Sequence, residues 1–498
     1  MSNPSSDRGI AADRALLWRG TVLNLVGFVL KNISPVLVIV LARVFDEATF
    51  GIYLSLHLFI LSSSRLAVFG FDKGLTWRVP RNQRDGYPLH RGVYEAAWTA
   101  HGAALLAWGL AAIPIAFGAL RWVPSLGDVS PAFVIIESAS IIPYMGLHTF
   151  AAALEGARQP QYRVYVNQCA AAAGGPILSL VLHGIGLGPI SLAIGYTAGN
   201  CLGVLLLLGG MRKYFPDASP WKLGWPDRAL FSYSVPLGIS EAIAAFLLRI
   251  DQWVVLLLLG GRMAAVYGVI GTLASGVKGI RQGYDPLIVA IVSRMGEATK
   301  GTLRSVYSYA VTMVTTLQMG VAVVVLFFAS EILLVAGKNY VVEPQALSLL
   351  LASHLLNGLL SMSGNVIIGM GRTGIALVLN VCTLLLHLGL TMLLIPHFGI
   401  AGAAGANALS YLAQGIALQV VQQRLVGQHL YERYTWFSFL LVGLFCAVVL
   451  GWQYQILAWP LLHRAAVFAG TAGTLGLAFW LRRDTLRAGG PAVAGAAE

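Results

Sequence analysis

Five basic side chains lie inside segments that are otherwise strongly apolar, and they are the residues best suited to bind a ligand. A charge near the middle of a bilayer costs roughly 2.5–3.5 kcal/mol even on lenient insertion scales. Five charges of one sign are therefore not expected to face lipid, and we expect them to line a wet cavity that suits an anionic ligand. The five are Lys31, Arg65, Arg249, Lys278 and Arg281.

Lys278 and Arg281 are three residues apart, so on a helix they share one face. Two adjacent cations repel each other, and a purely structural role would need two separate acids. One pyrophosphate would satisfy both, and a guanidinium suits phosphate oxygens well. Lys31 is central in its segment, where it either lines the cavity or pairs with an internal acid such as Glu95 or Glu137. The pair at 278 and 281 is therefore the first candidate anion site.

The other two cations, Arg65 and Arg249, each allow more than one role. Arg65 is about five residues from the end of its segment, from where its side chain could also reach water. Arg249 and Asp251 are two residues apart and point in different directions on a helix, whereas Glu241 lies two turns before Arg249 on the same face. Two alternatives follow: a static salt-bridge network, or coupling of transport to H⁺ or Na⁺ through Glu241 or Asp251.

The composition places these residues in a membrane. Of the 498 residues, 57% are hydrophobic and 11% are charged, whereas a soluble chain carries about 25% charged residues. Continuous apolar runs predict an all-α polytopic protein. The cysteines and histidines lack metal-ligand spacing, and no phosphate-binding glycine loop occurs, so we expect no metal, no cofactor and no ATP hydrolysis.

The apolar runs predict fourteen transmembrane helices, the first of them a retained helix rather than a signal peptide. The stretch 263–292 is unusually long and rich in glycine, with Pro286, and we expect it to be broken or strongly tilted. Pro236 predicts either a similar bend in the preceding span or, because it lies near the end, the first turn of that helix. The spans are 20–41, 50–70, 92–118, 130–153, 165–184, 187–209, 230–258, 263–292, 305–329, 344–370, 373–396, 400–423, 434–452 and 465–481.

The basic residues outside the spans indicate the orientation. The tails and even-numbered loops hold 23 of the 33 Lys and Arg, whereas the odd-numbered loops hold five. The positive-inside rule therefore predicts that both termini are cytoplasmic. The same asymmetry accounts for most of the net charge of +12, so no nucleic-acid partner is implied.

An internal repeat recurs about 214 residues along the chain. It predicts two six-helix lobes in the same orientation, at 1–212 and 229–424, joined by a cytoplasmic linker at 213–228. Residues 425–498 add helices 13 and 14 and a tail. Repeats of this kind place the substrate site between the lobes. The matching residues are Tyr53 with Tyr267, Arg158 with Arg372, Asn167 with Asn380, Gly184 with Gly399 and Tyr196 with Tyr411, and Arg65 is level with Lys278 and Arg281.

Four motifs in a fixed order carry a family resemblance over roughly residues 15 to 425. They are Leu41-Ala42-Arg43 with Gly51-Ile52-Tyr53, Ser234-Val235-Pro236-Leu237 with Arg249-Ile250-Asp251, Ala329-Ser330-Glu331-Ile332-Leu333, and Ile395-Pro396-His397-Phe398-Gly399-Ile400-Ala401-Gly402-Ala403. The chain resembles the polysaccharide-transporter branch of the multidrug/oligosaccharidyl-lipid/polysaccharide (MOP) exporter superfamily, the O-antigen and exopolysaccharide repeat-unit flippases.

The resemblance implies a multi-pass inner-membrane flippase rather than an enzyme. Its cargo would be an oligosaccharide on undecaprenyl pyrophosphate, moved to the outer leaflet by alternating access for exopolysaccharide, O-antigen or capsule synthesis. Membrane lipids and the polymerase or export machinery would be its partners.

Three alternatives stay open. A peptidoglycan-precursor flippase would carry the same pyrophosphate. A multidrug cation antiporter would be expected to have an acid in its first helix bundle, where span 20–41 carries Lys31 and no acid. A membrane glycan polymerase or glycosyltransferase would need a catalytic motif or a large outward loop, and the sequence shows neither.

Overall fold

The computed structural model describes residues 33–451, except 128, 160, 164–165, 167–170, 219–223, 295–299 and 342, together with 460 and 463. These residues form helices joined by short turns, and the described chain contains no strand. Eight helices in the described residues are long and apolar enough to cross a membrane, or nine if one bent pair counts as a span. The all-α polytopic class predicted from the sequence is therefore confirmed.

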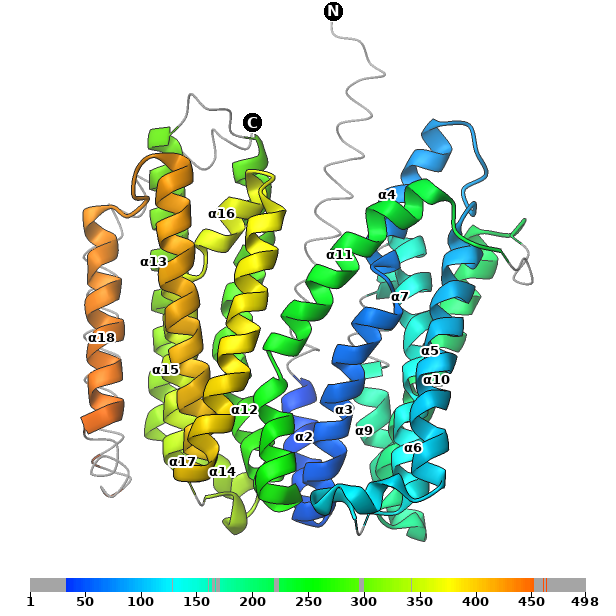
Figure 1. The fold of residues 1–498 in the computed structure, drawn as a ribbon, viewed down its shortest axis with the longest axis horizontal. Coiled ribbons are helices and arrows are strands. Elements are labelled where there is room, and N and C mark those ends of the chain that lie inside the picture. Colours follow the sequence, from blue (N-terminus) through cyan, green and yellow to red (C-terminus); the bar gives the residue numbers. More distant parts are fainter. Residues whose placement is uncertain are drawn as a thin grey trace, which may run out of the picture. The chain divides into compact units, whose positions relative to one another are not determined.

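The chain divides into two compact units, Met1–Arg249 and Ile250–Glu498. In the first unit, short elements η1 (Ala119–Trp122), η2 (Pro124–Leu126), α8 (Gln161–Arg163) and η4 (His183–Leu187) connect longer helices. The longer helices, which can be followed in Figure 1, are α2 (Ile33–Val44), α3 (Glu47–Ala67), α4 (Phe71–Arg84), α5 (Val93–Ala116), α6 (Pro131–Ala139), α7 (Ile141–Gly156), α9 (Ala171–Leu182), α10 (Ile190–Tyr214) and α11 (Arg228–Leu247).

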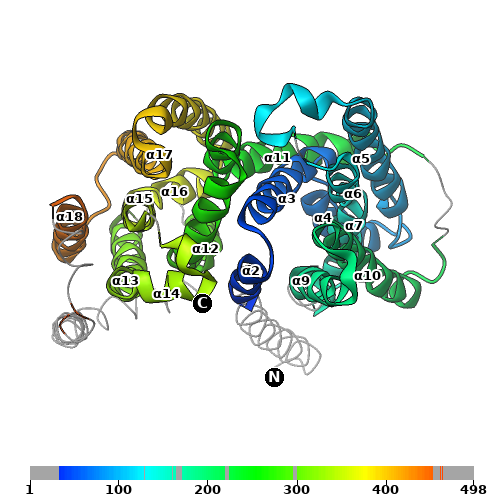
Figure 2. The same ribbon diagram turned by 90° about the horizontal axis from the view of Figure 1, so that it is seen from below.

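The second unit contains two very long helices, each interrupted by one glycine. Its elements, also seen end-on in Figure 2, are α12 (Ile250–Arg294), α13 (Lys300–Phe327), α14 (Ala329–Ala336), η6 (Lys338–Tyr340), α15 (Pro344–Leu360), α16 (Ser363–Gly369), α17 (Thr373–Val426), η7 (Arg433–Thr435) and α18 (Trp436–Gly451).

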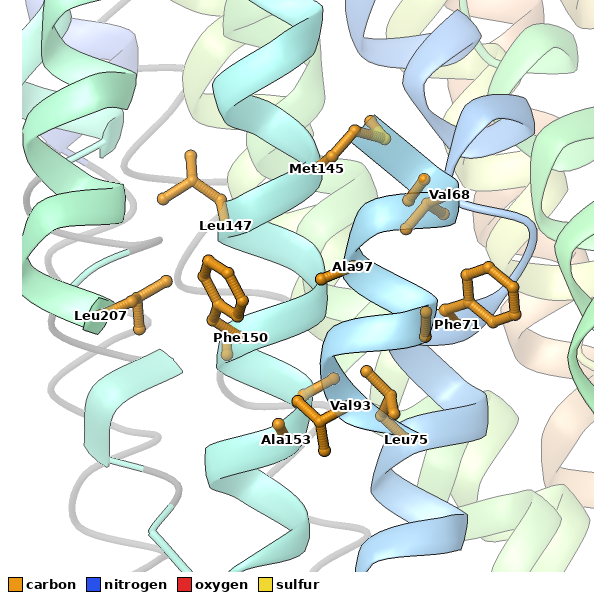
Figure 3. Close-up of a cluster of buried hydrophobic side chains, with 14 of the residues drawn as sticks. Val68, Phe71, Leu75, Val93, Ala97, Met145, Leu147, Phe150, Ala153 and Leu207 are labelled. Carbon is orange, nitrogen blue, oxygen red and sulfur yellow. The ribbon is translucent and has the colours of Figure 1, made fainter. Parts of the chain in front are cut away.

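The core of the first unit is built around α7, which packs against α4, α5 and α10. Figure 3 shows its side chains interleaving between these helices. Leu75 of α4, Val93 of α5 and Ala153 of α7 are fully buried there, and Leu207 of α10 closes another side. Burying a leucine or valine side chain of this kind contributes about 1.5–3 kcal/mol when the side chain is transferred from water. In lipid, the close packing of the side chains is what stabilises the helix contacts.

The polar helix α4 was not predicted from the sequence. Because this segment is rich in Asp, Lys and Arg, the sequence predicted a loop there. The segment is instead a helix that packs closely against α7 and α11. The ring of Trp77 stacks on Tyr233 of α11 at a centroid distance of 4.4 Å, and Arg78 forms an ion pair with Asp227. Asp227 also caps α11 by accepting a hydrogen bond from the Leu230 amide at 2.8 Å.

The chain breaks sharply between α3 and α4. Phe69 and Gly70 have positive φ angles of 51° and 70°. A Cβ atom on Gly70 would overlap the Ser234 carbonyl oxygen of α11, and a Cβ on Gly238 would lie only 2.5 Å from the Gly70 nitrogen. Only glycine at both positions lets the backbone of α11 lie directly on this break.

Of the two alternatives predicted for residues 263–292, the break is wrong and the strong tilt stays a prediction. Residues 261–294 are helical throughout, and α12 is interrupted earlier, at Gly260 (φ 82°, ψ 178°). A glycine inside a helix costs about 1 kcal/mol, which packing on neighbouring helices offsets. Here α12 packs against α13, α15, α16 and α17.

The preceding span is also interrupted at a different place from the one predicted. Pro236 lies inside α11, which continues to Leu247, and the next helix begins only at Ile250. The two residues between the helices, Leu248 and Arg249, therefore form the break.

Corresponding turns in the two units have the same geometry and refine the spacing of the internal repeat. The amide of Gln159 donates to the Leu154 carbonyl oxygen at 2.9 Å, and the amide of Arg372 donates to the Ile367 carbonyl oxygen at 3.1 Å. The residue before each donor has a positive φ angle, 62° at Arg158 and 77° at Gly371. Arg158 is thus structurally equivalent to Gly371 rather than to Arg372. We call the shift from Gln159 to Arg372 the repeat spacing.

A second turn corrects another residue match. Gly399 breaks α17 at φ 57° and ψ −140°, a conformation essentially restricted to glycine. Gly188 has nearly the same angles, 63° and −145°, just before α10. Gly188, rather than Gly184, is therefore the counterpart of Gly399. The predicted lobe limits at 212 and 229 stay a prediction. The division into compact units falls later, after α11, which therefore belongs to the first unit.

Candidate functional site

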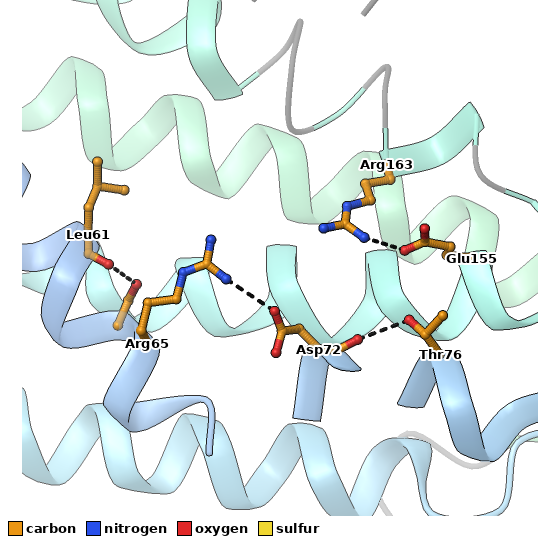
Figure 4. A network of polar contacts seen from close by, with 7 residues as sticks. Leu61, Arg65, Asp72, Thr76, Glu155 and Arg163 are labelled. Atoms are coloured by element: carbon orange, nitrogen blue, oxygen red, sulfur yellow. Dashed lines mark hydrogen bonds and ion pairs between the residues drawn. The ribbon is translucent and has the colours of Figure 1, made fainter. Parts of the chain in front are cut away.

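Arg65 of α3 forms an ion pair across the break with Asp72 of α4, at 3.1 Å (Figure 4). Asp72 is 6% exposed, and the Arg65 side chain is about one-third exposed. The Asp72 carbonyl oxygen accepts a hydrogen bond from the Thr76 hydroxyl, which holds the first turn of α4 in place. Part of the Arg65 side chain therefore stays exposed although the arginine has an acidic partner.

Further charges surround Asp72. Lys73, Arg163 and His148 lie within electrostatic range of this carboxylate. Arg163 is itself paired with Glu155, as Figure 4 also shows. Arg65 and Lys73 together exceed the single charge of Asp72, so this part of the first unit carries net positive charge.

The second unit repeats this arrangement at equivalent positions. Lys278 follows Arg65 by the repeat spacing, and Asp285 follows Asp72 by the same shift. Arg281 pairs with Asp285 at 3.4 Å, one helical turn along α12. The other Asp285 oxygen accepts a hydrogen bond from the Asn365 amide at 2.6 Å. Both units therefore carry basic residues beside one aspartate, although the intervening helix is broken in only one of them.

The guanidinium of Arg281 has donors to spare. It reaches the Asn357 carbonyl oxygen at a long 3.4 Å, and its Nε is buried without a hydrogen-bond partner among the described residues. Lys278 and Arg281 both lie within electrostatic range of His354 on α15. The two cations and one aspartate leave an excess positive charge in this part of the second unit.

The remaining predicted residues are distributed as follows. Arg249 is half-buried at the junction of α11 and α12, and both Arg249 and Arg65 lie within electrostatic range of Tyr144. Glu241 is exposed on α11. Lys31 falls outside the described residues, as do Asn167 and the last predicted span.

Asp251 is buried and firmly hydrogen-bonded. It accepts from the Tyr267 hydroxyl at 2.6 Å, from the Asn407 amide at 3.1 Å and from the Gln252 backbone amide at 2.9 Å. The Asn407 side-chain oxygen accepts in turn from the Ser353 hydroxyl at 2.5 Å. The repeat predicted Tyr267, but the sequence offered no signal for Asn407 or Ser353, which come from α17 and α15.

Within the described residues, no group of three or more His, Cys, Asp or Glu could hold a metal ion. The arrangement instead offers partly exposed cationic groups on the apolar helices α3 and α12, each held by an aspartate. Its chemistry suits reversible binding of an anion.

This fold is that of the polytopic transporters of the MOP superfamily. No protein family and no curated protein matches the chain by sequence. An inward-facing MATE-family multidrug resistance transporter of that superfamily matches with a TM-score of 0.65 and 14% identity, over 80% of this chain and 94% of the other. The lipid II flippase MurJ, in an inward closed conformation, matches with a TM-score of 0.68 and 10% identity, over 94% of this chain and 99% of the other.

Proposed function

We propose that this protein is a flippase that moves a polyprenyl-pyrophosphate-linked oligosaccharide from the inner to the outer leaflet of the inner membrane. One observation carries the proposal: an aspartate at equivalent positions of the two repeats, Asp72 or Asp285, pairs in each unit with a partly exposed arginine of an apolar helix. The family resemblance of the sequence supplies the glycan, since its relatives export repeat units for surface polysaccharides.

The charge of these sites favours an anionic cargo. In the second unit two basic residues, Lys278 and Arg281, accompany the single Asp285, and Arg281 keeps an unused buried donor. A pyrophosphate could accept hydrogen bonds from both cations without breaking the aspartate pair. An organic cation would be repelled by the same residues, which argues against a multidrug antiporter despite the MATE-like fold.

The peptidoglycan precursor is the second candidate cargo, and the match to MurJ over nearly the whole of both chains favours it. It shares the pyrophosphate, so the basic residues do not distinguish the two glycans. The identity of the lipid-linked sugar has to come from cells. A membrane polymerase is less well supported, since the neighbouring folds are those of transporters.

The test measures the sidedness of lipid-linked intermediates in cells lacking the protein, with a lectin or a periplasmic ligase as reporter. We expect oligosaccharide intermediates to accumulate on the cytoplasmic leaflet, with wild type restoring export and Lys278→Gln/Arg281→Gln failing to do so at equal protein level. Accumulation of peptidoglycan precursor instead would select the second candidate. Normal sidedness with failed chain growth would point to a polymerase.

A control that neutralises both partners of the ion pair separates cargo binding from structural pairing. Arg281→Gln alone leaves Asp285 unpaired, whereas Arg281→Gln/Asp285→Asn removes both charges. If Arg281 serves only the ion pair, the double variant restores export; if it binds cargo, export stays low. Arg163→Gln/Glu155→Gln removes the half-exposed pair beside Asp72 and serves as the matched control, which should export normally.

A further inference from the structure

Glu137 of α6 is the most completely isolated acid in the part of the chain that the structure describes. Its exposure is 0%, and neither carboxylate oxygen has a hydrogen-bond partner among the described residues. Nδ1 of His57 on α3 lies 3.9 Å from Oε1, and this nitrogen is also buried and has no hydrogen-bond partner among the described residues. The site described above uses neither residue.

The elements packed against α6 contribute uncharged groups at this level. Tyr53 of α3 and Tyr196 of α10 lie within electrostatic range of Glu137, and Tyr196 packs edge-on against His57 at 4.1 Å. The Tyr196 hydroxyl and both side-chain polar atoms of Asn200 have no hydrogen bond of normal geometry in the described chain.

The described residues of α7 and α5 add no acid to this site. On α7, Tyr144 lies near Tyr196. On α5, the Trp108 indole donates to the Ile135 carbonyl oxygen of α6 at 3.1 Å, and the titratable His101 lies two turns away, where its Nδ1 contacts the Ala97 carbonyl oxygen. Among the described residues, the formal charges near this site are those of Arg249, within electrostatic range of His57, and of Arg65, within range of Tyr144.

An ionised carboxylate in such a place would be costly. Burying an unpaired charge costs several kcal/mol even after relaxation, whereas a neutral carboxyl loses only its hydrogen bonds with water. The positive charge of Arg249 works against a second positive charge on His57, so a proton shared by this pair rests on the carboxyl. The neutral carboxyl is therefore the favoured form of Glu137 at this site.

We propose that Glu137 and His57 form a proton-binding site in the first unit, with Glu137 as the holder and His57 as the route to water. The His57 side chain is one-fifth exposed, whereas Glu137 is fully enclosed. A proton from water passes through the imidazole to a Glu137 oxygen, and the net charge of the pair rises from −1 to 0. Release reverses the path.

The inference deepens the proposed function by naming a site at which flipping can be coupled to protons, and its physiological meaning rests on that function. Proton binding itself can be measured without cargo. The coupling site expected from the sequence was Asp251 or Glu241; Asp251 already has three donors, and Glu241 is exposed.

The first experiment is infrared difference spectroscopy on the purified full-length protein in lipid nanodiscs, titrated from acid to alkaline pH. We expect a protonated-carboxyl band at neutral pH in wild type, its loss in Glu137→Gln, and its retention in Glu241→Gln. Glu137→Asp should keep a carboxyl band, which shows that a lost band is not lost folding. A neutral-pH band that survives in Glu137→Gln overturns the proposal, as does its absence from wild type.

The second readout follows hydrogen–deuterium exchange of that carboxyl after transfer to D₂O. We expect His57→Leu to keep the band and to slow its isotope shift about 100-fold, the lower range for a positioned acid–base group. An unchanged rate of exchange in His57→Leu would show that protons do not reach Glu137 through His57.

Flipping assays with and without a pH gradient separate the two proposals. If the Glu137 carboxyl band is present but no lipid-linked glycan is flipped, the proton-binding site is supported and the flippase proposal is contradicted. If the rate of flipping changes neither with the pH gradient nor in Glu137→Gln, the flippase proposal is supported and the coupling role of Glu137 is contradicted.

Discussion

Equivalent residues of the two repeats can face different chemistry. Tyr53 and Tyr267 were matched by the sequence repeat, and each lies beside a buried acid. In the first unit that acid is Glu137 of α6, without a hydrogen-bond partner in the described chain; in the second it is Asp251 of α12, with three. The repeat spacing does not relate the two acids to each other, so the repeat alone could not reveal them.

The Asp251 hydrogen bonds should contribute strongly to stability. Asp251→Asn removes the charged acceptor of the Tyr267 hydroxyl, and we expect it to lower the free energy of unfolding by about 1–3 kcal/mol. Combining Asp251→Asn with Tyr267→Phe should cost less than the sum of the two single changes. Thermal unfolding in detergent measures all three variants, and strict additivity would show that this hydrogen bond adds no stability.

Steric contact makes a second residue-level prediction. A Cβ on Gly369 would lie 2.7 Å from the Val292 Cβ, whereas one on Gly276 meets no atom within 4 Å. Gly369→Ala should therefore destabilise the protein by about 1–3 kcal/mol. Gly276→Ala should be neutral or stabilise by up to about 1 kcal/mol, because alanine favours helix. Equal unfolding midpoints for the two variants would contradict the packing of α16 on α12.

At the level of elements, the sequence predicted what long apolar runs determine. Span 92–118 corresponds to α5 at Val93–Ala116, and span 344–370 to α15 followed by α16. The many glycines of residues 263–292 led to a wrong position for the break in α12, because packing rather than helix propensity determines where this helix is interrupted. The polar α4 was missed since its stability comes from α7 and α11, which are distant in sequence.

The contact between α11 and the α3–α4 break gives a prediction at this scale. Gly238→Ala would place a Cβ 2.5 Å from the Gly70 nitrogen and 2.6 Å from the Phe69 carbonyl carbon, both backbone atoms that cannot rotate away. We expect a loss of about 1–3 kcal/mol in stability and a matching loss of export. Gly271→Ala, which meets nothing within 4 Å, is the control. Wild-type melting of Gly238→Ala would mean that α11 does not lie on the break.

At the level of the whole molecule, the candidate site was predictable in outline only. Charge in apolar segments singled out Arg65, Lys278 and Arg281, and the repeat aligned them. Their aspartate partners went unnoticed because Asp72 and Asp285 lie seven and four residues beyond the cations that they pair with, and only the folded helices show which spacing makes contact.

Orientation is tested by labelling single cysteines in a chain whose four native cysteines are replaced. With both termini cytoplasmic, Arg121→Cys, exposed on η1, should react with a membrane-impermeant maleimide in intact cells. Asp217→Cys, exposed after α10, should react only after the membrane is opened. The reverse pattern would invert the orientation and, with it, the proposed direction of flipping.

The position of α11 has a consequence for biosynthesis. By sequence α11 opens the second repeat, but it covers the backbone of the α3–α4 break in the first unit. A nascent chain released at the end of α10 therefore has all of the first repeat and still leaves that break uncovered. The first unit can therefore complete its packing only after α11 has been synthesised, so its folding extends into the synthesis of the second repeat.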